Sequence, residues 1–205
     1  MHLGDKERLN LWGMGQWFKT DAARFLEEFT QSTSDLLSSG EVKHLLSALA
    51  NIKQIKSIFQ RIHNYNHQLA RLAAKSFLES EFPALPWSEI EFADDDNAPG
   101  PDILVDRETV RIVGAVKTTE PCGRSKSGMT PTKFGGKQKE EITKDLRNLS
   151  SAKYASHERY MFVTSALAFQ ILKDDFRYGF PMVCFVLLSA SVEVSRPGRG
   201  RPAGD

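Results

Sequence analysis

The chain has 205 residues, which is enough for one sizeable domain or for a core of ~130 to 150 residues with an appendage. With 40% hydrophobic and 26% charged residues, it has the composition of an ordinary water-soluble globular protein. The net charge of +1 gives no overall signal for nucleic acid, so any DNA-binding surface must be local. No apolar run approaches the ~20 residues of a membrane span, and the N-terminus lacks the apolar core of a signal peptide. We therefore expect a cytoplasmic protein without a membrane partner.

The two cysteines, Cys122 and Cys184, are too few and too isolated to build a disulfide framework or a zinc site. We expect both to be ordinary reduced thiols.

Residues 6–82 predict helices, because apolar side chains recur at three- and four-residue spacing with few breakers. We expect a first helix around Phe25, a polar interruption over 31–40, a second helix over 41–62, and a third over 66–82 that ends before Pro83. On this stretch, His63 and His67 have a spacing that can bind metal. No Glu or Cys nearby completes such a site, so we interpret both as polar surface residues.

The centre of the chain predicts a β-hairpin. Alternation over 87–93 favours a first strand, and the acidic run 94–97 that follows is interpreted as a solvated turn. Two further apolar strands, 103–105 and 110–116, are joined by a polar turn, so the hairpin brings Asp102 and Lys117 together. Since residues two apart on a strand share a face, residues 115 and 117 leave the same side of the sheet and Val116 points to the other.

The rest of the chain continues the alternation of helices and strands. A long Gly-, Ser- and Thr-rich loop precedes a helix over 137–149, whose apolar stripe should pack on the sheet. A strand over 159–165, a helix to residue 176 and a buried strand over 182–188 follow. The expected fold class is therefore α/β, a central mixed sheet flanked by helices.

The combination of Pro101-Asp102, a hairpin and Ala115-Val116-Lys117 resembles the active-site motif of the PD-(D/E)XK nuclease superfamily, which includes many type II restriction endonucleases. The resemblance implies a restriction endonuclease-like core over 66–190. We expect a helical segment over 1–65 that serves dimerisation or DNA contact, and a flexible basic tail over 191–205.

The resemblance also implies a chemistry. Asp102 and the main-chain carbonyl of Val116 would hold Mg²⁺, for which Mn²⁺ can substitute, and Lys117 would orient the attacking water. On the following helix, Lys137 or Gln138 is expected to reach the active site, and Gln68 on the preceding helix is placed near the metal. The expected activity is that of a metal-dependent endodeoxyribonuclease, of the site-specific restriction type.

The motif departs from the superfamily at Ala115, where a Glu or Asp is usual. Three explanations are open: a natural inactive relative, a site completed by an acid from elsewhere in the chain, or a catalytic Glu replaced by Ala. The otherwise intact motif favours the third. For the second, Glu141 is the acid best placed to substitute. The alternative from another class is a non-catalytic DNA-binding module of the same fold.

A local basic excess follows the motif. Between Lys117 and Lys153 the basic residues outnumber the acidic ones, and we expect Lys126, Lys133 and Lys137 to line a path for double-stranded DNA. The surplus of apolar residues before Asn66 leads us to expect a homodimer.

Overall fold

The computed structural model describes residues 42–85, 90–92, 100–124, 131–189 and 192–197, with isolated positions 16, 24, 27, 30, 31, 34, 35 and 38 before them. The chain divides into two compact units, Met1–Asn66 and His67–Asp205. The expected acidic turn over 94–97 and most of the first helix lie outside the described residues.

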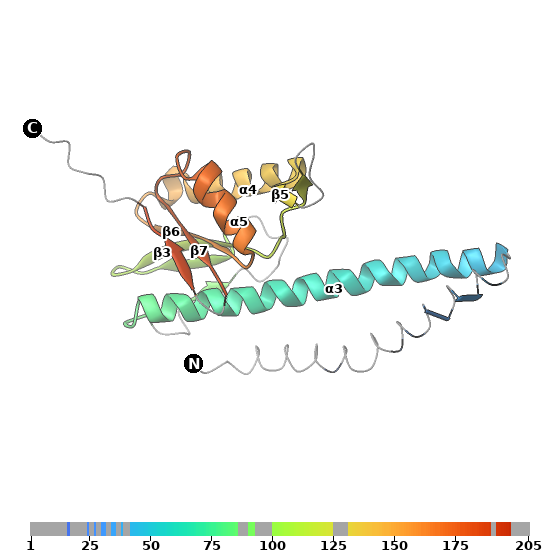
Figure 1. The fold of residues 1–205 in the computed structure, drawn as a ribbon. Helices are drawn as coiled ribbons and strands as arrows, with labels where there is room; N and C mark the ends of the chain where they lie inside the picture. The colour runs from blue at the N-terminus through green and yellow to red at the C-terminus, as the bar shows by residue number, and fades with distance from the viewer. Residues whose placement is uncertain are drawn as a thin grey trace, which may run out of the picture. The chain divides into compact units, whose positions relative to one another are not determined.

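The second unit is built on a six-stranded sheet in the order β1-β2-β3-β6-β7-β8 (Figure 1). Strands β3, β6 and β7 run parallel to one another, and β2 and β8 run antiparallel to their neighbours. The bounds are β1 (Glu91–Phe92), β2 (Ile103–Asp106), β3 (Arg111–Lys117), β6 (Glu158–Val163), β7 (Val183–Leu187) and β8 (Glu193–Ser195). The predicted mixed sheet is confirmed.

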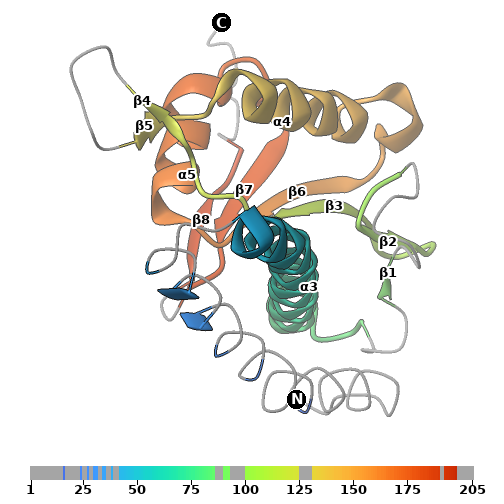
Figure 2. The ribbon, with the colours of Figure 1, turned by 90° about the vertical axis from the view of Figure 1, so that its right-hand side faces the viewer.

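Helices cover both faces of this sheet (Figure 2). From His67 onward, α3 (Val42–Glu81) lies on one face. The other face carries α4 (Gly136–Leu149) and α5 (Ala166–Ile171), which continues as a π-helical turn, η4 (Leu172–Phe176). The α/β class predicted from the sequence is thus correct.

The strands separate two apolar cores by simple alternation. In β3, Val113 and Ala115 join the core under α4 and α5, whereas Ile112 and Val116 join the core under α3. Successive side chains of a strand point to opposite faces, so one strand supplies both layers. The stripe predicted for α4 is confirmed, since Ile142, Leu146 and Leu149 are all buried.

Helix α3 is a single helix of 40 residues, whereas two helices were expected over the same range. The polar residues between Ile62 and Asn66 interrupt the apolar pattern without breaking the backbone, because this stretch holds neither glycine nor proline. Within the expected polar interruption over 31–40, the described positions 31, 34, 35 and 38 are also helical.

The expected loop after β3 contains a two-stranded sheet of β4 (Gly123–Arg124) and β5 (Pro131–Lys133). Gly123 permits this pairing, because a Cβ at that position would lie 2.6 Å from the carbonyl oxygen of Phe134. No real Cβ tolerates so short a distance to backbone. Residues 125–130, which include Lys126, lie outside the described residues.

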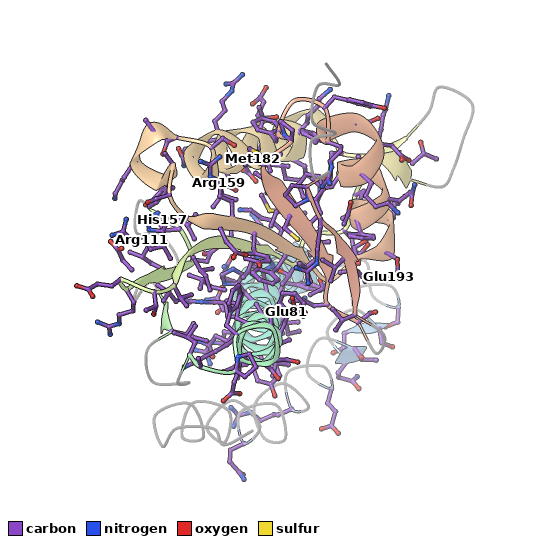
Figure 3. The ribbon with its side chains drawn as sticks, turned by 90° about the vertical axis from the view of Figure 1, so that its left-hand side faces the viewer. Glu81, Arg111, His157, Arg159, Met182 and Glu193 are labelled. Carbon is purple, nitrogen blue, oxygen red and sulfur yellow. The ribbon has the colours of Figure 1, made fainter. Side chains whose placement is uncertain are left out.

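The flexible tail expected over 191–205 is wrong for residues 193–195. Glu193–Ser195 form β8, which pairs with the edge of β7, and Arg196 forms an ion pair with Glu81 at the end of α3. Glu81 and Glu193 are labelled in Figure 3. The strand has only three residues, and the remainder from Gly198 lies outside the described residues.

The two cysteines are free thiols, as expected. Cys122 is exposed, and Cys184 is buried in β7, where desolvation raises the pKa of its thiol to about 11. Within the described ranges, none of the helices combines the length and apolar character needed to cross a membrane.

The buried stripe of α4 gives a test of the fold. Leu146→Ala should lower the free energy of unfolding by about 2–5 kcal/mol, because the fully buried side chain leaves a cavity between α4 and the sheet. Arg147→Ala, at the exposed neighbouring position, should change it by less than about 0.5 kcal/mol. Urea unfolding of the two variants measures the difference, and equal losses would contradict this packing.

Candidate active site

The predicted hairpin is present, and its two strands have different lengths. Strand β2 pairs with β3 from Asp106 opposite Arg111 to Ile103 opposite Gly114. Strand β3 continues to Lys117, and on its other edge it remains paired with β6. Past Gly114, the β3 backbone groups that face β2 must therefore find partners outside the β2 ladder.

Asp102 supplies the first of these partners. The backbone N–H of Val116 donates to Asp102 Oδ2 at 2.7 Å, so the carboxylate continues the ladder where β2 stops. The Val116 carbonyl oxygen lies 3.3 Å from His67 Nε2. The same nitrogen is 3.9 Å from Asp102 Oδ1. One carboxylate, one carbonyl and one imidazole thus converge at this edge of the sheet.

Lys117 lies at the end of β3, and its ammonium is paired. Lys117 Nζ is 2.6 Å from Asp145 Oδ2 on α4. Glu141, the acid expected to reach the site, lies one turn earlier with 60% of its side chain exposed and pairs with Lys137 on the surface. The acid that α4 brings to the motif lysine is therefore Asp145.

Ala115 is buried, and it lines a pocket of about 260 Å³. Asp145 lines the same pocket, as do Gly100 and Pro101, which directly precede Asp102. The remaining wall comes from the end of α4 and the turn after it, through Asn148, Leu149, Ser151, Lys153 and Tyr154. A longer side chain at position 115 would extend into this space.

Gln138 has a different set of contacts from those expected. Its Oε1 accepts hydrogen bonds from the backbone N–H groups of Cys122 and Gly135, at 3.1 and 2.9 Å. Its Nε2 donates to the carbonyl oxygen of Glu120 at 2.8 Å. These bonds fasten the segment after β3 to the start of α4, so Gln138 positions backbone near the site.

The expected DNA-contacting lysines lie beyond Lys117 in the chain. Lys133 is exposed on β5, and Lys137 is exposed on the first turn of α4. At the opposite ends of β3 and β6, Arg111 donates to Ser156 Oγ at 3.1 Å, close to His157 (Figure 3). In the chain, Lys133 and Lys137 thus follow the carboxyl end of β3, which bears Lys117.

The residues present fit a divalent cation in part. Asp102 Oδ1, the Val116 carbonyl and His67 Nε2 face one another, and a carboxylate, a carbonyl and an imidazole are all ordinary ligands. This mixed oxygen and nitrogen set suits Mn²⁺ better than Mg²⁺, which prefers oxygen alone. Among the described residues, no group of three or more His, Cys, Asp or Glu side chains is arranged to hold a metal. Water or substrate would have to supply the other ligands.

Sequence reasoning missed the positions of His67 and Asp145. His67 is three residues before buried Ala70, and Asp145 lies between Ile142 and Leu149 in the apolar stripe of α4. A polar residue in register with a buried face is the signal that could have found both. The resemblance placed Gln68 near the metal. In the structure it is the preceding residue on the helix, His67, that contacts Asp102 and Val116.

The bond between Asp102 and Val116 predicts a stability difference. Asp102→Ala should lower the free energy of unfolding by about 1.5–3 kcal/mol, because a hydrogen bond to a charged group is lost and a backbone N–H is left without its partner. Asp102→Asn should lose less, since its amide oxygen can still accept. Asp106→Ala is the control: this exposed aspartate of the same hairpin pairs with Arg111, and such surface pairs contribute about 0–1 kcal/mol. Equal losses for the two alanine variants in urea unfolding would contradict the assignment.

No protein-family model matches the chain, and neither the curated proteins nor the solved structures include a significant match to it.

Proposed function

We propose that this chain is a metal-dependent endodeoxyribonuclease of the PD-(D/E)XK type that hydrolyses phosphodiester bonds in double-stranded DNA. The observation that carries the proposal is the convergence at one sheet edge of Asp102, the Val116 carbonyl and the end of β3 that bears Lys117. We further propose a site-specific enzyme of the restriction type.

The order of elements supports the proposal. Helix α3 is followed by β1, β2 and β3, then by α4 and β6, and β6 pairs in parallel with the motif strand β3. A central sheet flanked by helices in this order is what the resemblance implies for the superfamily. The position of Asp102 before β2 and of Lys117 at the end of β3 supports the proposal.

The chemistry assigns a role to each residue. A divalent cation held at Asp102 and the Val116 carbonyl would neutralise charge on the phosphate and lower the pKa of a bound water. Lys117 would orient the attacking water and stabilise the negative charge that develops on the phosphorus oxygens. The water oxygen would bond to phosphorus and lose its proton to solvent, while the bond from phosphorus to the leaving sugar oxygen breaks and that oxygen takes a proton from solvent.

Two such sites could cut both DNA strands in one encounter, and we propose that the working form is a homodimer. The helical segment before Asn66 provides the contact. Phe59 on α3 is one large apolar side chain of this segment that is exposed in the single chain.

A non-catalytic DNA-binding module of the same fold is the second candidate. The observation in its favour is Ala115, which cannot ligate a cation through its side chain. The two candidate functions predict different results for a carboxylate at position 115. It would restore cleavage in the nuclease and would leave the binding module without activity.

The first test restores that carboxylate. Ala115→Glu should cleave plasmid or phage DNA in Mg²⁺ or Mn²⁺ at least about a hundredfold faster than the parent chain and be inert in chelator, because the pocket beside Ala115 has room for a side chain that adds a ligand. Agarose gels of the digests measure the rate, and discrete bands indicate site specificity.

In the Ala115→Glu background, Asp102→Asn should abolish cleavage through loss of metal, whereas Lys117→Met should abolish it with metal binding retained. If the Ala115→Glu protein folds and binds DNA yet cuts no substrate, the nuclease proposal is wrong and the binding module is favoured.

The second test concerns the DNA path. Replacing Lys126, Lys133 and Lys137 together by Gln should weaken DNA binding and reduce the slope of log affinity against log salt by about 2–3, since each phosphate contact contributes about 0.9. Arg107→Gln, in the exposed hairpin turn at the other end of β3, is the control and should leave the slope unchanged. Fluorescence anisotropy at several salt concentrations gives the slopes, and an unchanged slope in the triple variant would remove these lysines from the DNA path.

A further inference from the structure

We propose that helix α3 pairs with α3 of a second copy of this chain, side by side and in the same direction, as a two-stranded coiled coil. The inference rests on the homodimer of the proposed function and names the surface that forms it. That surface is a stripe along α3, the α3 seam, which consists of Phe59, Ile62, Asn66, Leu69 and Ala73.

The spacing of the α3 seam is that of a coiled coil. Its members are separated alternately by three and by four residues, which makes them positions a and d of a seven-residue repeat. In the sequence, the same spacing continues toward the start of the helix at Leu45, Ala48, Ile52 and Ile55. The pattern thus covers about four repeats, as many as a coiled coil needs.

The α3 seam is open to solvent in the single chain. The side chains of Phe59, Ile62 and Leu69 are 65%, 38% and 40% exposed. Packing on the sheet uses other residues of α3, such as Ala70 and Ala74, which are buried in the core on that face. Large apolar side chains left exposed in a row are stabilised when a second helix covers them, because their surface is then removed from water.

Asn66 indicates what covers the seam. It occupies an a position between apolar members of the stripe, where an apolar partner would leave its amide without hydrogen bonds. Opposite Asn66 of a second copy, each amide can both donate to and accept from the other. A single Asn at an a position fixes the register and the number of strands in a coiled coil. The occupant that satisfies this residue is therefore another α3 in the same register.

The residues that flank the seam permit this pairing. In a parallel pair, position g of one helix meets position e of the next repeat on the other helix. Ile58 and Tyr65 are at the g positions, and His63 and Ala70 are at the e positions that they would meet. None of these four residues is a lysine, an arginine or a carboxylate. Like charges therefore do not oppose the contact along this part of the seam.

The first experiment cross-links the full chain after Cys122→Ser, which removes the exposed native thiol and leaves Cys184 buried. Phe59→Cys and Leu69→Cys should each form disulfide-linked dimers under mild oxidation. A disulfide needs Cα atoms within about 7 Å, and a parallel pair brings each seam position close to its own copy. Gln60→Cys, at the exposed position next to Phe59 and outside the seam, is the control and should stay uncross-linked on non-reducing gels.

The second experiment measures assembly by analytical ultracentrifugation of the full chain at micromolar concentration. Ile62→Glu should raise the dissociation constant of the dimer at least about tenfold, because it places a charge in the apolar seam. Gln60→Glu adds the same charge outside the seam and should leave the constant unchanged. Asn66→Ile should shift the assemblies toward trimers, since the residue that selects two strands is lost. Circular dichroism confirms that each variant is folded.

The outcomes separate this inference from the proposed nuclease. A monomeric parent chain overturns it, because the seam is then left open or covered within the chain, and so does equal cross-linking of Gln60→Cys and Phe59→Cys. Cross-links formed only between Phe59→Cys and Ala73→Cys in a mixture would show an antiparallel pair and overturn the parallel one. These results leave the nuclease to be judged by cleavage in Ala115→Glu. Cross-linking at both seam positions without cleavage supports the seam and removes the nuclease.

Discussion

The hydrogen bond from the Val116 N–H to Asp102 is the interaction on which the site depends. Strand β3 extends three residues past the point where β2 begins to pair with it, and buried backbone groups are costly when unpaired. Asp102 resolves this by acting as a side-chain continuation of β2. Its carboxylate is therefore oriented by the sheet itself, with Oδ2 engaged and Oδ1 turned toward His67.

The parallel pairing of β3 with β6 fixes the remaining groups. Six paired positions, from Ile112 to Lys117, join β3 to β6 up to the end of β3. Lys117 leaves the sheet on the side covered by α4, where it pairs with Asp145. The apolar stripe of α4 then determines which of its polar residues faces inward, and this is Asp145. Gln138 holds the start of the same helix to the segment that follows β3. The apolar cores on the two faces of the sheet thus fix the positions of the polar groups at this edge of the sheet.

Local patterns predicted the elements well and predicted the contacts between distant elements poorly. The alternation around Ile112 and Val116 was enough to place the hairpin, and the stripe of Ile142, Leu146 and Leu149 was enough to place α4. These patterns report burial, which is a property of one segment at a time.

The failures have physical causes of the same kind. The sequence near Asn64 does not show whether the two predicted helices form one continuous helix, because the polar residues there are compatible with either a helix or a turn. The three residues of β8 are too few to show alternation. To predict that Asp145 and not Glu141 pairs with Lys117, one must know how α4 is rotated about its axis on the sheet. That rotation depends on β3 and β6 as much as on the helix itself.

The charges at the site bear on the choice between the two proposed functions, metal-assisted hydrolysis of DNA and DNA binding alone. Asp102 and Asp145 carry one negative charge each and Lys117 one positive charge, so these three side chains have a net charge of −1. Such a group repels a phosphate, and partly buried carboxylates lose hydration that their partners must replace. A module that only bound DNA here would be served better by apolar or basic residues. A divalent cation at Asp102, as proposed, would raise this net charge to +1 and so favour a bound phosphate. The acids around Lys117 therefore support the proposed metal-assisted hydrolysis over the proposed binding module.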